Sequence, residues 1–373
     1  MKIKVLNLIS SPYGLGGAEK LLLDMAEFYD REKISVFYCN LFNSPQKNSL
    51  FTESVNEKQL PALNISGHRL RDIPLIISQL LNVVKNNKIN ILHTHLVHAT
   101  TIGNIATMLK KKHRTIITQH YTRSSLNKRY LKKLDQSAVR KADCVIAISS
   151  AVKNDLLEQG VKENNIYIIP NGINLANFDR ESEKKSKLLN DLSKQGKYVI
   201  GSVGNLSLLK DHLTLVRAMK KVVKILPEVH LLIIGEGPER RNLENLIKEY
   251  KLELNVTLLG FQADIPALIR NVDLYVHSSV TEAFGLAILE AMAARKCVIA
   301  TEVDGVVDVV ENNVSGFLIP SRDAQIMADY ICQAIKNPQQ TLEMGLKGRK
   351  RVEDNFRIET VTKKYQDLYE KIS

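Results

Sequence analysis

Short apolar runs alternate with amphipathic stretches of helical length along nearly the whole chain, in two series. Six runs of strand length form the first series: Lys2–Ile9, Ile34–Leu41, Ile89–His93, Arg114–Gln119, Cys144–Ile148 and Ile166–Ile169. Six more follow the polar, charged stretch Asp179–Lys197: Tyr198–Val203, His230–Ile234, Val256–Leu259, Leu274–His277, Val298–Ala300 and Phe317–Ile319. Strands that alternate with helices of about 10–15 residues form parallel sheets with both faces covered. The sequence therefore predicts an α/β protein with two Rossmann-like parallel-sheet domains.

The length of 373 residues also favours two domains, because a single core stops growing beyond roughly 250–300 residues. We expect a first domain over 1–178, a linker over 179–197, a second domain over 198–356 and a helix within 357–373. In open α/β sheets, ligands bind at the carboxyl ends of the strands. Two such edges predict a cleft between the domains.

The basic residues are concentrated in the first half of the chain. The formal net charge is +12, and residues 1–178 hold 24 Lys and Arg against 13 Asp and Glu. Within 110–141 the single acid is Asp135, against eleven cations: Lys110, Lys111, Lys112, Arg114, Arg123, Lys128, Arg129, Lys132, Lys133, Arg140 and Lys141. A field of one sign attracts partners of the opposite sign, so we expect the first domain to meet an anionic partner.

The sequence carries no signal for a membrane span or for disulfides. No apolar stretch reaches the roughly 18 residues of a membrane-spanning helix, and Met1–Ser10 has the pattern of a strand rather than a signal peptide. The four cysteines lie far apart, without the spacing of a zinc or redox motif. We expect a cytoplasmic protein with reduced thiols.

Two glutamates, Glu282 and Glu290, follow an apolar strand with seven residues between them. Glu282 is predicted on the loop after the strand, and Glu290 within the helix that follows. Ionised Glu accepts several hydrogen bonds and can therefore hold sugar hydroxyls. The alternative is a glycosidase acid/base pair, but glycosidase carboxylates usually come from separate strands.

Two loops have the composition of phosphate-binding loops. Gly16 and Gly17 join the first strand to the first helix, where glycines let backbone N–H groups approach an anion at a helix N-terminus. Their spacing is not Gly-x-Gly-x-x-Gly, which weighs against a nicotinamide dinucleotide. In the second domain, Asn205 and Lys210 occupy the corresponding loop, and the lysine can reach a phosphate as a point charge.

Histidines follow two strands of the first domain. His120 ends one strand and is expected to point to the cleft. His93, His95 and His98 form a His-x-His-x-x-His run, which can open a metallohydrolase site. The position before the last histidine, often Asp in such sites, is Val97, and no further ligand cluster is evident. We therefore expect no metal site.

Together these motifs resemble those of the retaining nucleotide-sugar glycosyltransferases of family 4, which have a Glu-x7-Glu signature. The resemblance implies the GT-B architecture, two Rossmann-like domains facing across a cleft, with the terminal helix packed back on the first domain. It implies the catalytic residues His120, Lys210 and Glu282. It implies substrate contacts by Gly16, Gly17, His95, Asn205, Phe284, Gly285, Leu286 and Glu290. No Asp-x-Asp motif is present, so no metal or other cofactor is expected beside the nucleotide sugar as co-substrate.

The chain departs from the family pattern around the expected donor pocket. Asn205 stands where the family usually has Arg, so one of two expected cations is missing. Other changed positions are Ala283, Arg295, Cys297, Asp304 and Asp308. These departures predict either a different donor or a subunit that binds nucleotide with weak catalysis.

The resemblance implies transfer of a sugar, with retention, from a nucleotide sugar. UDP-hexose or UDP-N-acetylhexosamine is the favoured donor. The acceptor is expected to be a lipid-linked or growing surface saccharide of a capsule, O-antigen or lipopolysaccharide, reached from the inner face of the cytoplasmic membrane. The alternatives are the weak binding subunit, a sugar-nucleotide epimerase and a metallohydrolase.

A basic amphipathic helix is predicted over Leu126–Val139. Its cations are Lys128, Arg129, Lys132 and Lys133, and its apolar face is Leu126, Tyr130, Leu131, Leu134 and Ala138. Such a helix can lie on an anionic membrane, or it can be an ordinary surface helix whose apolar side packs on its own core. We expect an anionic membrane or acceptor contact there. Nucleic acid is not expected, because no nucleic-acid-binding module is evident.

Overall fold

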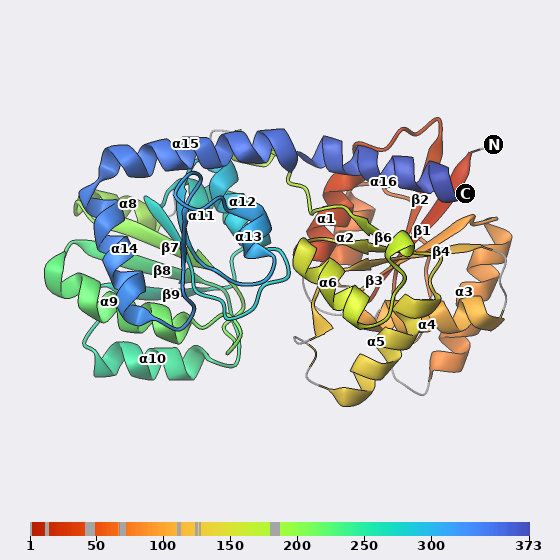
Figure 1. The fold of residues 1–373 in the computed structure, drawn as a ribbon, viewed down its shortest axis with the longest axis horizontal. Helices are drawn as coiled ribbons and strands as arrows, with labels where there is room; N and C mark the ends of the chain where they lie inside the picture. The colour runs from red at the N-terminus through yellow and green to blue at the C-terminus, as the bar shows by residue number, and fades with distance from the viewer. Residues whose placement is uncertain are drawn as a thin grey trace. The chain divides into compact units, whose positions relative to one another are not determined.

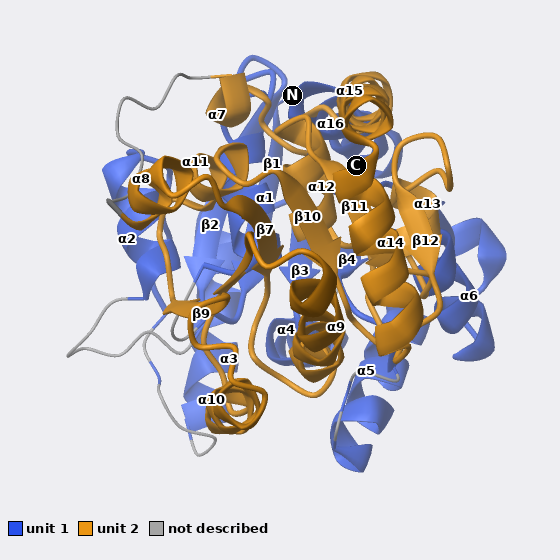
Figure 2. Ribbon diagram, turned by 90° about the vertical axis from the view of Figure 1, so that its left-hand side faces the viewer, with its two compact units in different colours: residues 1–172, 358–373 blue, residues 173–357 orange. Residues whose placement is uncertain are grey.

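The computed structural model describes residues 2–11, 15–41, 49–65, 67, 72–109, 113–123, 126, 128–179 and 187–373. The chain forms two compact units (Figure 2): Met1–Gly172 with Ile358–Ser373, and Ile173–Arg357. Each unit contains a six-stranded parallel sheet flanked by helices (Figure 1). The predicted fold class is therefore confirmed.

The first unit has the strand order β2-β1-β3-β4-β5-β6, with every neighbouring pair parallel. Its strands are β1 (Ile3–Ile9), β2 (Ile34–Asn40), β3 (Ile91–His95), β4 (Arg114–Gln119), β5 (Cys144–Ala147) and β6 (Ile166–Ile168). Its helices are α1 (Gly17–Met25), α2 (Leu50–Glu57), α3 (Ile73–Asn86), α4 (Val97–Leu109), α5 (Arg129–Lys141), α6 (Ser150–Glu158) and α16 (Ile358–Ile372).

The two faces of the first sheet are covered by different helices, because successive side chains of a strand point to opposite faces. Val5 and Ile91 pack with α1 and α16 on one face, while Leu6 and Leu92 pack with α3 and α4 on the other. The last helix, α16, lies beside α1 (Figure 1). It contributes five buried residues to this core: Ile358, Val361, Tyr365, Leu368 and Tyr369.

The second unit has the strand order β12-β11-β10-β7-β8-β9, again parallel throughout. Its strands are β7 (Tyr198–Val203), β8 (Val229–Ile234), β9 (Val256–Gly260), β10 (Leu274–His277), β11 (Cys297–Thr301) and β12 (Phe317–Ile319). Its helices are α7 (Ala176–Asp179), α8 (Lys187–Lys194), α9 (His212–Ile225), α10 (Arg240–Glu249), α11 (Ile265–Arg270), α12 (Leu286–Ala293), α13 (Val306–Val309), α14 (Ala324–Lys336) and α15 (Pro338–Asn355). Leu231, Ile233 and Val276 pack against α9, α10 and α14 in one core.

Several boundaries differ from the prediction. β3 is Ile91–His95 rather than Ile89–His93, so His95 belongs to the strand. The stretches that form α2 and α15 were not expected to be helical. Part of the predicted linker is α8, which packs against β7 in the second unit; residues 180–186 of that linker lie outside the described residues.

The first unit ends at Gly172, and α7 joins the second unit although it was assigned to the first domain. Two arginines of the second unit hold α7 in place. Arg349 donates to the Asp179 carboxylate at 2.7 Å, and Arg270 donates to the Asn177 carbonyl at 2.5 Å.

In the described part of the chain, no helix combines the length and the apolar character needed to cross a membrane. The four cysteines are buried and free, and burial raises the pKa of Cys39, Cys144 and Cys297 to about 12.

Candidate functional site

Lys210, Glu282 and His277 meet at the carboxyl edge of the second sheet. β10 ends at His277, and Lys210 lies in the loop between β7 and α9. The Lys210 ammonium forms an ion pair with Glu282 Oε2, and His277 Nε2 lies 3.2 Å from the same oxygen. The Glu282 and Lys210 side chains remain 16% and 28% exposed. A ligand can therefore reach both charged groups.

Glu282 is ionised in this cluster. Burial by itself would raise its pKa, but the charge of Lys210 and the hydrogen bond from His277 outweigh burial and lower the pKa to about 2. Burial lowers the pKa of His277, against the opposing effect of Glu282. The site thus presents one cation and one anion, which suit a phosphate and a sugar hydroxyl respectively.

Asp304 stabilises the loop that carries Glu282 through hydrogen bonds. Its carboxylate accepts hydrogen bonds from the Thr281 hydroxyl and the Glu282 backbone N–H, and Gly305 N–H donates to the Glu282 carbonyl at 3.0 Å. Gly285 then precedes α12 with φ +95°, a conformation that favours glycine. The first N–H groups of a helix have no intrahelical acceptor and attract anions. The predicted contact of the start of α12 with sugar or phosphate stays a prediction.

The other residues predicted to contact substrate near α12 differ in how exposed their side chains are. Phe284 is 2% exposed, and its ring packs against Phe356 with centroids 5.8 Å apart, so the side chain belongs to the core. Leu286 is half-buried in the first turn of α12, and Glu290 follows in the second turn with 7% exposure. The predicted placement of Glu282 on the loop and Glu290 on the helix is correct.

The loop that contains Asn205 and Lys210 lies against a glycine-containing turn after β8. A Cβ on Gly235 would come within 2.0 Å of the Gly204 carbonyl oxygen, and a Cβ on Gly237 within 2.2 Å of Asn205 Oδ1. Asn205 is exposed. Glycines thus permit the close approach that shapes this loop, while Lys210 alone supplies its cation.

His120 and His95 form a hydrogen-bonded pair in the first unit. His95 Nδ1 lies 3.1 Å from His120 Nε2, and His95 Nε2 lies 3.2 Å from Asn7 Oδ1. His120 is half-buried, whereas His95 is fully buried. Burial lowers the pKa of His120 to about 4. His95 was expected to line a cleft, but its side chain supports His120 instead of offering a surface to a ligand.

A second layer of polar side chains lies below this pair. His93 Nδ1 is 2.7 Å from the Tyr369 hydroxyl, His93 Nε2 is 2.7 Å from Thr118 Oγ1, and the His93 ring lies 4.2 Å from the His95 ring. All ring nitrogens of His93 and His95 thus have partners within the protein, so neither ring offers a nitrogen to a metal. Among the described residues, no group of three or more His, Cys, Asp or Glu side chains is arranged to hold a metal ion.

Asp135 holds the residues on either side of His120. This carboxylate is fully buried on α5 and accepts hydrogen bonds from Gln119 Nε2 at 3.0 Å and the Tyr121 hydroxyl at 2.7 Å. Burial raises its pKa, against these hydrogen bonds. Asp135 therefore links α5 to the end of β4, where Gln119 lies.

Four residues of these sites were not predicted from the sequence: Asn7, His277, Asp135 and Asp304. His277 carried a local signal, because it ends a strand shortly before Glu282. Asp304 was noted only as a departure from the family. Asn7 and Asp135 carried no local signal, because their partners come from other strands or helices.

Gly16 and Gly17 lie at the start of α1, as the sequence pattern predicted. Both are exposed, and Gly16 is the N-cap residue. A Cβ on Gly16 would come within 2.8 Å of Glu19 Oε2, so a carboxylate occupies the same helix end. Residues 12–14 of this loop lie outside the described residues. The predicted contact of Gly16 and Gly17 with a diphosphate stays a prediction.

The predicted basic helix is α5, and Lys128 precedes it as N-cap. Lys128, Arg129 and Lys133 are exposed, and Lys132 is half-buried. Only part of the expected apolar face is buried. Ala138 is buried, and Leu126 and Leu131 are half-buried, but Tyr130 and Leu134 are 54% and 43% exposed.

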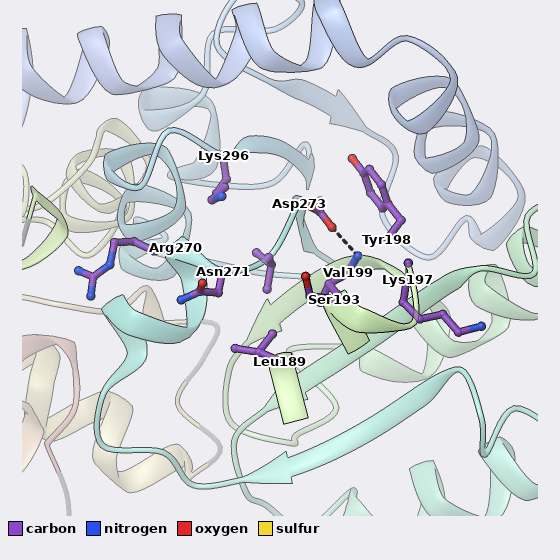
Figure 3. Close-up of a pocket in the computed structure, with 11 residues that line it drawn as sticks. Leu189, Ser193, Lys197, Tyr198, Val199, Arg270, Asn271, Asp273 and Lys296 are labelled. Carbon is purple, nitrogen blue, oxygen red and sulfur yellow. Dashed lines mark hydrogen bonds between the residues drawn. The ribbon is translucent and has the colours of Figure 1, made fainter. Parts of the chain in front are cut away.

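A pocket of about 450 Å³ lies at the opposite edge of the second sheet, near the amino ends of β7, β10 and β11 (Figure 3). Several of its polar groups already have partners. Lys197 pairs with Glu228 at 2.7 Å, and Asp273 accepts from the Val199 N–H at 2.7 Å. Because it lies at the amino ends of the strands, this pocket is separate from the Lys210–Glu282 cluster at their carboxyl ends.

Two family models match the chain. The model of Glycosyltransferase Family 4 matches residues 15–177, and that of Glycosyl transferases group 1 matches residues 183–351. The chain belongs to the family-4 glycosyltransferases. Its motifs in both units are thus those of a transferase family, as the sequence resemblance implied.

Curated relatives are consistent with this membership, and a solved structure shares the fold. The chain is 26% identical over 380 residues to the Escherichia coli UDP-Gal:alpha-D-GlcNAc-diphosphoundecaprenol alpha-1,3-galactosyltransferase, covering 99% of this chain and 97% of that protein. It is 27% identical to the Bacillus anthracis N-acetyl-alpha-D-glucosaminyl L-malate synthase, covering 79% and 78%. The crystal structure of Anabaena Alr3699/HepE in complex with UDP-glucose superposes with a TM-score of 0.87 at 23% identity, covering 99% and 100%. These relatives give no support to the epimerase or weak-subunit alternatives.

Proposed function

We propose that this glycosyltransferase moves a sugar, with retention, from UDP-hexose or UDP-N-acetylhexosamine to a hydroxyl of a lipid-linked saccharide. The observation that carries the proposal is the pairing of Lys210 with Glu282 at the carboxyl edge of the second sheet, beside the start of α12. The pair supplies a cation for a diphosphate and a carboxylate for a sugar hydroxyl. The galactosyltransferase relative, which covers nearly the whole chain, supports the class of acceptor.

Negative charge grows on the diphosphate as the bond to the sugar breaks. Lys210 and the N–H groups at the start of α12 would stabilise that charge, an electrostatic contribution available before the reaction begins. Glu282 would hold a donor-sugar hydroxyl, and Glu290 the ribose. The departing phosphate oxygen would take the acceptor proton, so the proposal needs neither a protein base nor a metal.

We further propose that the first unit docks on an anionic membrane surface through α5 and the end of α4. Met108 and Leu109 are 63% and 67% exposed at the end of α4, and Tyr130 and Leu134 are exposed on α5. Lys141 Nζ lies 3.5 Å from Met108 Sδ, which brings the two helix ends together. Exposed apolar side chains among cations match an interface of acyl chains and anionic headgroups. A lipid-linked acceptor would be presented at such a surface.

The transfer is tested with purified protein, a panel of UDP-sugars and either a diphosphoundecaprenol-linked N-acetylglucosamine or L-malate as acceptor. We expect UDP release together with a lipid-linked product that keeps the anomeric configuration of the donor. Lys210→Ala and Glu282→Gln should each lower kcat by about 10²–10³-fold, the effect of losing a charge stabiliser in an active site. The control Lys350→Ala, in an exposed ion pair of the same unit, should keep the wild-type rate.

Other outcomes would contradict the proposal. Transfer to L-malate instead of the lipid-linked sugar would overturn the acceptor class. A changed donor sugar without UDP release would indicate an epimerase. UDP binding without turnover on any donor would indicate a binding subunit.

A further inference from the structure

The hydrogen bonds below His120 determine which of its ring nitrogens carries a proton. Asn7 Oδ1 can only accept, so His95 Nε2, 3.2 Å away, must donate. Burial lowers the pKa of His95 well below its usual value, so its ring is neutral near pH 7 and its Nδ1 has a lone pair. That Nδ1 lies 3.1 Å from His120 Nε2, which must therefore donate.

The remaining ring nitrogen of His120, Nδ1, carries a lone pair. Burial lowers the pKa of His120 to about 4, so its ring is neutral near pH 7 and carries a single N–H. Since that hydrogen is on Nε2, Nδ1 has the lone pair. Among the described residues, His120 Nδ1 has no hydrogen-bond partner, and its side chain is only half-buried.

We propose that Asn7 is a positioning residue, which through His95 holds His120 in the tautomer whose Nδ1 accepts a hydrogen bond from a hydroxyl of the bound saccharide. The role in sugar binding rests on the proposed function, whereas the tautomer rests on hydrogen bonds and burial within the first unit. Asn7 is 1% exposed, so it acts only through His95.

The layer below His95 has a different role. The His93 ring lies 4.2 Å from the His95 ring and is held by the Tyr369 hydroxyl and Thr118. These contacts fix where the His95 ring lies, but neither ring nitrogen of His95 bonds to them. Tyr369 therefore provides a matched control, a buried hydroxyl in the same cluster whose loss should not reverse the tautomer of His120.

The tautomer is measured by long-range 1H–15N correlation spectra of protein labelled at its histidine ring nitrogens, with the His120 signals assigned by their loss in His120→Gln. We expect the wild type at pH 7 to show a protonated Nε2 and an unprotonated Nδ1 for His120. Asn7→Leu should leave a mixture of the two tautomers. Tyr369→Phe should lower the melting temperature while keeping the His120 spectrum of the wild type.

The kinetic readout separates positioning from a general loss of structure. Asn7→Leu should lower kcat about tenfold, the size of one hydrogen bond in the transition state, while the Kd for UDP stays unchanged. Tyr369→Phe should keep kcat.

Two results would overturn the inference. One is a wild-type spectrum with the proton on Nδ1 of His120, which would mean that the Asn7 amide is turned the other way. The other is an Asn7→Leu spectrum identical to the wild type. A wild-type protein with the expected tautomer but without transfer would instead overturn the proposed function.

Discussion

The ion pair of Lys210 and Glu282 joins two loops of the second unit that lie 72 residues apart in the chain. Glu282 is only 16% exposed, so solvent screens this pair less than it screens a surface pair. Removing one partner leaves the other charge partly buried and uncompensated. The interaction that prepares the site for a ligand therefore also stabilises the second unit.

The stability that comes from Glu282 should depend on pH. Its pKa is lowered from the ordinary 4.5 to about 2, so as pH falls the unfolded chain binds this proton before the folded protein does. The contribution is fully present above pH 4.5 and is lost as pH falls toward 2. In urea unfolding, Glu282→Gln should therefore lose more stability relative to wild type at pH 6 than near pH 3.

Glu343→Gln is the control for this prediction, because Glu343 pairs with Lys347 on an exposed helix face. That variant should change the unfolding midpoint little at either pH, since exposed pairs contribute little. A Glu282→Gln effect of equal size at both pH values would contradict the assigned pKa.

At the scale of elements, side-chain alternation predicted most strands but not their order. Asn7, His93, His95 and Thr118 point to the same face of the first sheet, and the register pairs His95 with Thr118. Alternation within one strand indicates which residues share a face. It does not indicate that β3 lies between β1 and β4, which brings these polar side chains together.

Helix α5 shows a second limit of local reasoning. Its amphipathic pattern predicted one apolar face, yet Ala138 is buried while Tyr130 and Leu134 are exposed. A helical wheel shows which residues share a side of the helix. The elements packed against the helix decide which part of its apolar side is covered. The uncovered part, among the cations, is the surface that we propose for membrane docking.

Vesicle binding tests the surface of α5. Replacing Lys128, Arg129, Lys132 and Lys133 by Glu should weaken binding to phosphatidylglycerol-containing vesicles at least a hundredfold, because each cation contributes about 1 kcal/mol near an anionic surface. Tyr130→Ser with Leu134→Ser should weaken binding further through lost apolar contact. Vesicle co-sedimentation measures both effects.

The matched control reverses four exposed lysines of the second unit: Lys224, Lys248, Lys347 and Lys350. It changes the net charge equally and should keep vesicle binding. Equal loss in both variants would show that net charge, rather than the α5 surface, controls binding.

At the scale of the whole molecule, the two units have separate cores although the chain passes between them twice. The first unit ends at Gly172 and resumes at Ile358, and α16 then completes its core with buried Val361, Tyr365 and Tyr369. The residues of the Lys210–Glu282 cluster all belong to the second unit. The Asn7–His95–His120 chain belongs to the first.

Calorimetry should therefore resolve two unfolding transitions. UDP at about 100 times its Kd should stabilise one of them by roughly 2.7 kcal/mol, because the proposed nucleotide contacts lie in the second unit. Leu368→Ala should lower the other transition, since emptying a buried leucine site costs about 2–5 kcal/mol. Leu368 is 4% exposed and packs in the first core.

Two outcomes would contradict this division. A Leu368→Ala variant that lowers the UDP-sensitive transition would show that α16 stabilises the second unit. A single transition that UDP shifts as a whole would show that the two cores unfold together.

The two α/β series, the loop position of Glu282 and the helix position of Glu290 were predictable from the sequence, because they depend on periodicity over a few residues. The folded structure was needed to show that His277 and Lys210 share Glu282, that buried Asp135 bonds to Gln119, and that Asn7 reaches His95. These contacts join residues from separate strands and loops. The contacts depend on the order of the strands in each sheet, and the pKa values of these groups depend on how deeply the groups are buried. Neither strand order nor burial can be read from a short stretch of the chain.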